Sequence, residues 1–181
     1  MPVVELSKGL TVAVDVLAWG VIHAGTGYLA HRLPDRCFQS DSWLTRLRGV
    51  ERSGRLWRVL RVAHWKDHLP EAGGFFAGGV SKRTVPSSSD ADLLMFAALT
   101  RRAELTHWMA VAGSVLFVIW NPLWVVPVMV VYGVVVNAPF IAIQRYNRLR
   151  ITRILSRRSA RTRRDRETIG NNMPKGSPPN R

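Results

Sequence analysis

The sequence predicts an all-α integral membrane protein. No charged residue occurs from position 109 to position 143, a run longer than the roughly 20 apolar residues that one helix needs to cross a bilayer. Asn121-Pro122 interrupts this run near its middle, and proline lacks an N–H and disfavours helical backbone at the residue before it. We therefore predict a transmembrane helical hairpin over residues 103–144. A buried hairpin in a soluble core is the alternative.

The charges outside the hairpin predict its orientation. The chain has 181 residues and a formal net charge of +14, although 47% of its residues are hydrophobic. Of its lysines and arginines, 13 lie within residues 32–102 and 12 within residues 145–181. Loops rich in lysine and arginine tend to stay on the cytoplasmic side. We expect a multi-pass cell-membrane protein whose basic loop and C-terminus are cytoplasmic and whose N-terminus is outside.

Residues 1–31 contain an apolar block of about one span and predict an N-terminal transmembrane helix. A signal peptide is the alternative, but Glu5 and a single Lys8 stand where a basic start is expected. Asp15 lies inside this block, and a carboxylate is costly in lipid. We expect Asp15 to face the protein interior, with an arginine as a candidate partner.

Residues 32–102 are predicted to be a basic cytoplasmic region that contains an amphipathic interfacial helix and a loop. Within residues 43–65, apolar side chains recur at helical spacing beside arginines, which is typical of a helix whose arginines reach lipid headgroups. A helix that only covers the hairpin is the alternative. Residues 64–79 and 81–90 are expected to be loop, with Ser89 or Asp90 capping a helix that runs into the hairpin.

The C-terminal part is predicted to be a basic surface helix over residues 145–168 and a disordered tail over residues 169–181. Anionic lipid headgroups are the expected partners of its arginines. A nucleic acid is not expected, because these arginines lack interleaved aromatic residues and lie next to a membrane. The sequence gives no oligomeric state.

Glu104 and His107 are the candidate catalytic residues. They are three apart on the helix that enters the hairpin, so they share one face. A histidine oriented by a carboxylate can remove a proton from a hydroxyl, as acyl or glycosyl transfer requires. Arg101 lies one turn earlier and is a candidate for binding a phosphate or an oxyanion. The alternative is that Glu104 pairs with Arg101 and that His107 bonds a neighbouring helix.

A second polar group is expected at the cytoplasmic end of the hairpin. Asn137 precedes Pro139 inside an apolar helix, and the kink leaves Asn137 able to bond across the bundle. Membrane anchoring alone would not need the amides found here, which indicates substrate binding at headgroup level. The candidate binding residues at this end are Asn137, Gln144, Arg145, Tyr146, Asn147 and Arg148. No metal site is expected, because His64 and His68 alone form an incomplete ligand set.

Residues 102–108 (RAELTHW) and 136–155 (VNAPFIAIQRYNRLRITRIL) resemble the glycosyl-4,4'-diaponeurosporenoate acyltransferases of bacterial carotenoid synthesis. Residues 32–38 and 49–75 extend the resemblance, which covers residues 32–158. It implies a small membrane enzyme that transfers a fatty acyl group to a sugar hydroxyl of a glycosylated carotenoid. Trp65 and Lys66 also fall at matching positions. This chain departs from the family in its longer glycine-rich loop, in its extended tail and at Leu149, where the family favours proline.

The resulting hypothesis is a membrane acyltransferase acting on a glycosylated carotenoid or a related glycolipid. His107 acts as the general base and Glu104 sets its tautomer. Arg145, Arg148 and Lys66 bind the phosphates of the acyl donor, which is acyl-CoA or acyl carrier protein, and no cofactor is needed. The alternative is a non-enzymatic basic membrane anchor or assembly protein that binds anionic lipid or an acidic partner.

Overall fold

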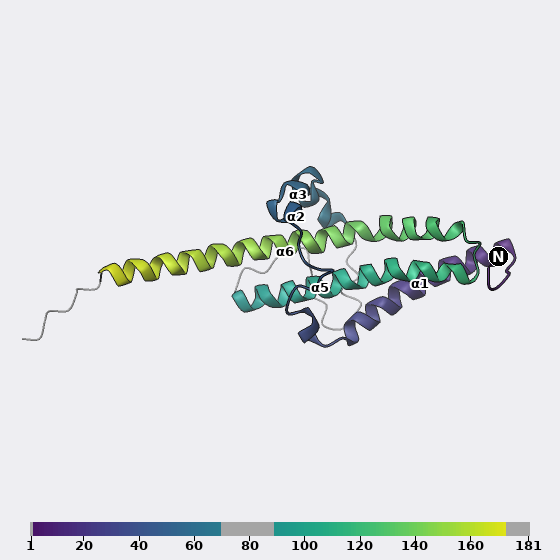
Figure 1. The fold of residues 1–181 in the computed structure, drawn as a ribbon, viewed down its shortest axis with the longest axis horizontal. Helices are drawn as coiled ribbons and strands as arrows, with labels where there is room; N and C mark the ends of the chain where they lie inside the picture. Colours follow the sequence, from purple (N-terminus) through teal and green to yellow (C-terminus); the bar gives the residue numbers. More distant parts are fainter. Residues whose placement is uncertain (1, 70–88, 173–181) are drawn as a thin grey trace, which may run out of the picture.

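The computed structural model describes residues 2–69 and 89–172. Within these residues the chain forms helices and connecting segments and no strand, in agreement with the all-α prediction. Three long helices, α1, α5 and α6, lie along a common direction, and α6 extends far beyond the other two (Figure 1). Most of the loops expected over residues 64–79 and 81–90, and most of the disordered tail expected over residues 169–181, lie outside the described residues.

The hairpin forms where the sequence predicted it. Helix α5 (Asp90–Gly113) continues as the 3-10 helix η4 (Ser114–Ile119), and after a turn the chain returns as α6 (Val125–Asn172). The Ser89 side chain caps α5 by accepting a hydrogen bond of 3.0 Å from the backbone N–H of Asp92, which confirms the expected start of this helix.

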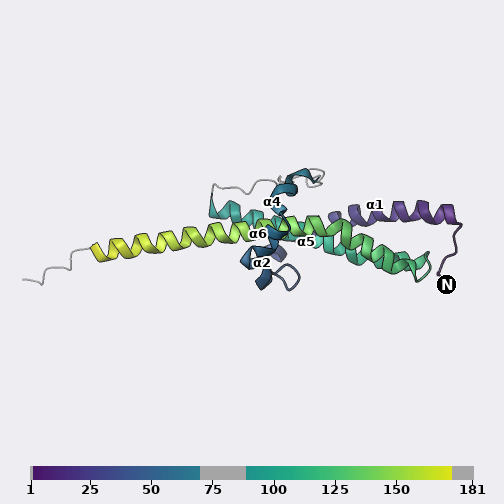
Figure 2. The same cartoon turned by 90° about the horizontal axis from the view of Figure 1, so that it is seen from above.

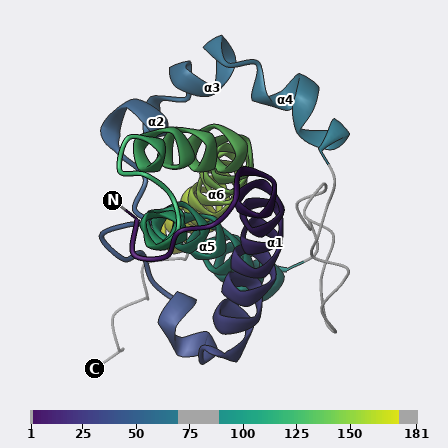
Figure 3. The ribbon, with the colours of Figure 1, turned by 90° about the vertical axis from the view of Figure 1, so that its right-hand side faces the viewer.

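Helix α1 (Lys8–Arg32) packs along the hairpin, as the end-on view in Figure 3 shows. Its start is held at the hairpin turn by a backbone hydrogen bond of 2.9 Å from Val4 to Ile119. Asp15 accepts hydrogen bonds of 2.8 Å from Trp120 Nε1 and from Asn121 Nδ2. The partners of Asp15 are therefore turn residues and not an arginine. The N-terminus and the turn lie at the same end of the molecule.

Helix α6 is one uninterrupted helix of 48 residues that contains Pro139. Residues 145–168 are helical, as predicted, but they continue α6 along nearly the same line and do not form a separate helix (Figure 2). By length and composition, α1 and the Val125–Ile169 part of α6 are apolar enough to cross a membrane. The first arm of the predicted hairpin falls on the end of α5 and on η4, and neither element is among the described helices that meet this criterion.

The single amphipathic helix predicted within residues 43–65 is wrong. The structure has three short helices there, α2 (Gly49–Ser53), α3 (Arg55–Val59) and α4 (Val62–Trp65), followed by the 3-10 turn η2 (Lys66–His68). Two left-handed residues separate them, Gly54 at φ 77° and Arg61 at φ 49°. A further 3-10 turn, η1 (Asp35–Phe38), follows α1.

The short helices wrap around one side of α6 (Figure 3). Their core is formed by Leu47, Trp57, Val62, Ile143 and Leu149. This packing matches the alternative that the amphipathic segment covers the hairpin. A second core, formed by Leu93, Phe96, Ala97 and Ile151, joins the start of α5 to α6.

Candidate active site

Glu104 lies at the centre of a buried ion network between α5 and α6. Its side chain has no solvent-exposed surface. Arg145 Nε donates a hydrogen bond of 2.7 Å to Oε1, and Arg148 Nη2 donates to Oε2. Trp108 Nε1 also donates to Oε1, at 3.1 Å. Both carboxylate oxygens of Glu104 therefore accept hydrogen bonds from side chains of α5 and α6.

Helix α2 and the segment before it close the other side of this network. Arg145 Nη1 donates to both carboxylate oxygens of Glu51, at 2.9 and 3.0 Å, and its Nη2 donates to the carbonyl oxygen of Leu44 at 2.6 Å. Arg148 Nη2 reaches the carbonyl oxygen of Thr45 at 2.8 Å. Two carboxylates and two guanidinium groups therefore balance one another, and none of the four side chains is more than 12% exposed. Removing one member of such a set leaves a buried charge unpaired.

His107 is bonded to Asn137 on the facing helix, with its Nδ1 at 2.9 Å from the Asn137 Oδ1. The Asn137 Nδ2 donates at 2.8 Å to the carbonyl oxygen of Gly133, which fixes the orientation of the amide. Because an amide oxygen only accepts, Nδ1 of His107 carries a proton. In the neutral ring, Nε2 is then the basic nitrogen. The ring stacks on Phe140, with 4.9 Å between the centroids.

This geometry changes the roles assigned to two predicted residues. Asn137 was expected to bind substrate, but it is buried and holds His107. Glu104 was expected to set the tautomer of His107, but Asn137 contacts Nδ1 while Glu104 accepts from arginines. The prediction that Asn137 bonds across the bundle is confirmed.

The remaining predicted cations each have a carboxylate partner. Arg101 donates to Asp41 at 2.8 Å and to the carbonyl oxygen of Phe38 at 3.0 Å. Lys66 pairs with Asp67 at 2.5 Å. The alternative pairing of Glu104 with Arg101 is therefore not the one that forms. Each of the predicted phosphate-binding cations is therefore paired with a carboxylate in the structure.

Aromatic and amide residues of the prediction lie around α6. Trp65 donates from Nε1 to the carbonyl oxygen of Leu60 at 2.8 Å, and Tyr146 packs edge-on against Trp57. Gln144 and Asn147 are buried. The buried Oε1 of Gln144 and the Nε and Nη1 of Arg148 have no hydrogen-bond partner within the described structure. Since buried polar atoms are nearly always bonded, these atoms mark unused hydrogen-bonding capacity next to the ion network.

A groove that the sequence analysis did not foresee runs beside the ion network. Its volume is about 520 Å³. It is lined by Trp43, Leu44, Arg48, Glu51, Trp57, Trp108, Val111, Val134, Ala138, Ile141, Ala142 and Arg145. We call it the α5–α6 groove. The sequence signal that could have located its polar end is Glu51, the only acidic residue within residues 43–65.

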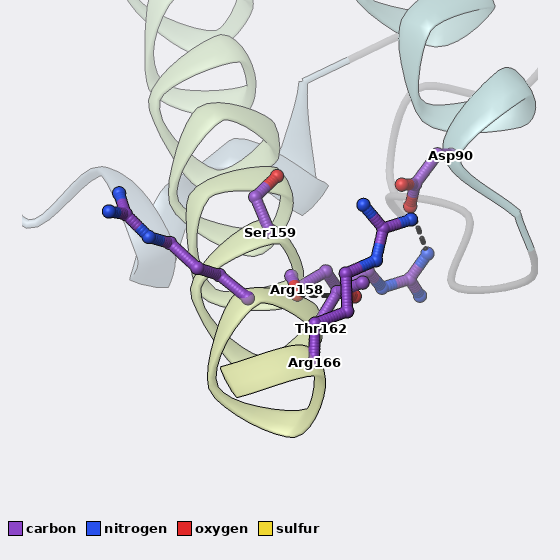
Figure 4. Close-up of a pocket in the computed structure, with 6 residues that line it drawn as sticks. Asp90, Arg158, Ser159, Thr162 and Arg166 are labelled. Atoms are coloured by element: carbon purple, nitrogen blue, oxygen red, sulfur yellow. Dashed lines mark hydrogen bonds and ion pairs between the residues drawn. The ribbon is translucent and has the colours of Figure 1, made fainter. Parts of the chain in front are cut away.

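A second hollow, of about 430 Å³, lies where α6 leaves the body of the molecule. Figure 4 shows the Arg158 side chain of α6 paired with Asp90 at the start of α5, at 2.7 Å. The other lining residues are Ser159, Thr162, Arg163 and Arg166, all on α6. This hollow is basic and lacks the apolar wall of the α5–α6 groove.

Comparison with known proteins identifies the class of this protein as an acyltransferase. A family model described as glycosyl-4,4'-diaponeurosporenoate acyltransferase matches residues 38–157. The chain belongs to this family.

Two relatives carry the same name. The protein from Staphylococcus haemolyticus (strain JCSC1435) is 30% identical over 154 residues, which cover 83% of this chain and 90% of the relative. The protein from Staphylococcus aureus (strain USA300) is 27% identical over 147 residues, which cover 79% and 88%. No solved structure matches the chain.

Proposed function

We propose that this protein is a cell-membrane acyltransferase that moves a fatty acyl group onto a sugar hydroxyl of a glycosylated carotenoid or a related glycolipid. The acceptor class follows the name of the relatives, glycosyl-4,4'-diaponeurosporenoate acyltransferase. The membrane location is supported by the two long apolar helices α1 and α6. The chemistry rests on one observation, the His107–Asn137 pair, which leaves Nε2 of His107 as the base.

In the proposed reaction, Nε2 of His107 takes the proton of the sugar hydroxyl as its oxygen attacks the acyl carbonyl carbon. The bond from that carbon to the donor's leaving group then breaks, and the leaving group receives the proton from His107. The ring is positively charged between these steps, and Asn137 Oδ1 accepts from Nδ1–H throughout. A positioned general base typically contributes about 10²- to 10⁴-fold in rate.

The ion network has a structural part in this proposal. Arg145 and Arg148 are neutralised by Glu51 and Glu104, so they hold α2, α5 and α6 together. Donor phosphates, from acyl-CoA or from acyl carrier protein, would instead meet exposed arginines. Gln144 is proposed to contact the sugar, which the unbonded Oε1 supports.

The proposed orientation places both basic regions in the cytoplasm. The N-terminus and the hairpin turn share one end of the molecule, while the extended, arginine-rich part of α6 forms the other (Figure 1). This polarity supports the assignment because basic segments favour the cytoplasmic side.

The test is mass spectrometry of lipids extracted from cells that lack this gene and from cells that carry it again. We expect deletion to remove one fatty acyl group from a glycolipid or glycosyl-carotenoid, and the wild type to restore it. His107→Ala should fail to restore it although the protein reaches the membrane at normal levels. His64→Ala is the matched control, because His64 is an exposed histidine on a short helix. Restoration by His107→Ala would refute the assigned base.

A further inference from the structure

We infer that the α5–α6 groove holds the fatty acyl chain of the donor, with the donor's anionic head at Arg48. The inference deepens the proposed function and rests on it, since it places one of the two substrates. The groove's volume of about 520 Å³ falls within the roughly 300–1,000 Å³ that is usual for small-molecule sites.

The wall of the groove suits a hydrocarbon chain. Val111 on α5 faces a row of aliphatic side chains on α6, from Val134 through Ala138 to Ala142. Ala138 and Ala142 are one turn apart, and their small side chains leave room beside the helix. Burial of apolar surface stabilises a bound hydrocarbon chain in proportion to the number of CH₂ groups that it removes from water.

The polar end of the groove is suited to an anionic head. Glu51 and Arg145 line it, but they neutralise each other. Arg48 also lines it and is exposed, and its backbone N–H donates to Glu51 Oε2. Within the described residues its guanidinium group forms no salt bridge and donates from Nη2 to the carbonyl oxygen of Trp43 at 3.4 Å. Its guanidinium group lies 5.9 Å from the ring centroid of Trp43, which is 77% exposed. Arg48 is therefore the cation available at this end.

The groove lies at the same level along α5 and α6 as the proposed base. Trp108 follows His107 on α5, and Ala138 follows Asn137 on α6. Trp108 and Ala138 both line the groove. Arg145 is about two helical turns from Asn137 towards the basic end of α6. An acyl carbonyl lies between the head and the hydrocarbon chain of its donor. With the head at Arg48 and the chain along Val134, this carbonyl falls at the level of His107.

Photo-crosslinking tests occupancy without requiring turnover. The probes are palmitic acid with a diazirine near its methyl end and the CoA thioester of the same acid, each applied to the purified full-length protein in detergent. We expect the label on α5 and α6 residues around Val111 and Val134. Val134→Phe should reduce labelling severalfold by filling the groove. Val135→Phe is the matched control, because Val135 is the neighbouring residue, is 64% exposed and does not line the groove.

The proposed binding of the donor's anionic head by Arg48 is tested with Arg48→Ala. This variant should reduce labelling by the CoA thioester by about tenfold, the effect of roughly 1.4 kcal/mol of lost interaction. Arg46→Ala, at an exposed arginine outside the groove, should leave labelling unchanged. A reduction with palmitic acid as well would show that a carboxylate head uses the same arginine.

The chain lengths of the products give the second measurement. Val134→Phe should shift the transferred acyl groups to shorter chains, whereas Val135→Phe should keep the wild-type distribution. Equal labelling and equal products in both variants would overturn the inference. Labelling that is specific to the groove, together with no acyl transfer by the wild type, would refute the proposed function and leave the groove as a lipid site.

Discussion

A single amide at position 137 links two helices and sets the chemistry of a histidine. Asn137 donates to the Gly133 carbonyl within α6 and accepts from His107 on α5, and only 1% of its surface is exposed. Because both polar atoms of the amide are used, it cannot rotate without losing two buried hydrogen bonds. The basic nitrogen of His107 therefore points away from Asn137.

Two substitutions of Asn137 with similar size separate this role from packing. Asn137→Asp keeps an oxygen that accepts from Nδ1, so we expect measurable acyl transfer. Asn137→Leu has no acceptor, and we expect kcat to fall by about 10²-fold, within the range of general-base effects, with little change in KM. The measurement is steady-state transfer to a glycolipid acceptor. Equal kcat values for the two variants would show that Asn137 only fills space.

Residue spacing identified His107, Glu104 and Asn137 as candidates but could not assign their partners. Glu104 and His107 share a face of one helix, so local geometry suggested a pair. The pairing that forms instead joins Glu104 to Arg145 and Arg148, which are 41 and 44 residues away. Such contacts depend on how α6 packs against α5, and the spacing of residues along one helix does not predict that packing.

The contact between α1 and the hairpin depends on a missing side chain at Gly133. A Cβ atom added there would lie 2.9 Å from Cη2 of Trp19, closer than real contacts allow. The Trp19 ring also packs against Phe117 and Tyr132, with 5.1 Å between centroids in each case. Trp19 therefore has little freedom to move away, and Gly133 permits α1 to approach α6.

We expect Gly133→Leu to destabilise the protein by about 1–3 kcal/mol, the usual cost of overpacking a close contact. Gly20→Leu is the matched control, because Gly20 lies in α1 with nothing within 4 Å of its added Cβ. That control should gain a little stability from the better helix propensity of leucine. Thermal unfolding in detergent measures both variants. A Gly133→Leu variant as stable as the control would contradict the close packing of α1.

Elements with strong local signals were predictable and others were not. The hairpin followed from a long uncharged run broken by Asn121-Pro122, and its turn lies there. The prediction of one continuous interfacial helix was wrong because Gly54 and Arg61 adopt left-handed backbone conformations, which separate the short helices. Trp57 then reaches the carbonyl oxygen of Glu51 from Nε1 at 3.0 Å, an arrangement that a continuous helix would not allow.

The whole molecule has an apolar end and a basic end, joined by α6. Residues 125–143 of α6 span about 28 Å at 1.5 Å per residue, close to the roughly 30 Å of a bilayer core. Residues 145–169 extend for about 37 Å more. In the proposed orientation, the far part of this arm lies beyond the Debye length of about 8 Å from the headgroups. We propose that its arginines bind a soluble acidic partner, of which acyl carrier protein is the candidate.

Neutralising the arm distinguishes a docked donor from a general effect of charge. We expect the triple variant Arg161→Gln, Arg163→Gln and Arg164→Gln to transfer acyl groups from acyl carrier protein about tenfold more slowly, since three exposed charge pairs contribute up to about 1 kcal/mol each. Transfer from acyl-CoA should change little, because the arm is remote from Arg48.

The matched control removes three exposed arginines from the short helices, through Arg52→Gln, Arg55→Gln and Arg58→Gln. Because this control loses the same total charge from another surface, it should keep its rate with acyl carrier protein. Rates measured with both donors at low and high salt complete the test, since screening should slow the wild type with acyl carrier protein and leave the arm variant nearly unaffected. Equal losses in both triple variants would mean that the total charge matters and the arm does not, and would remove acyl carrier protein as its specific partner.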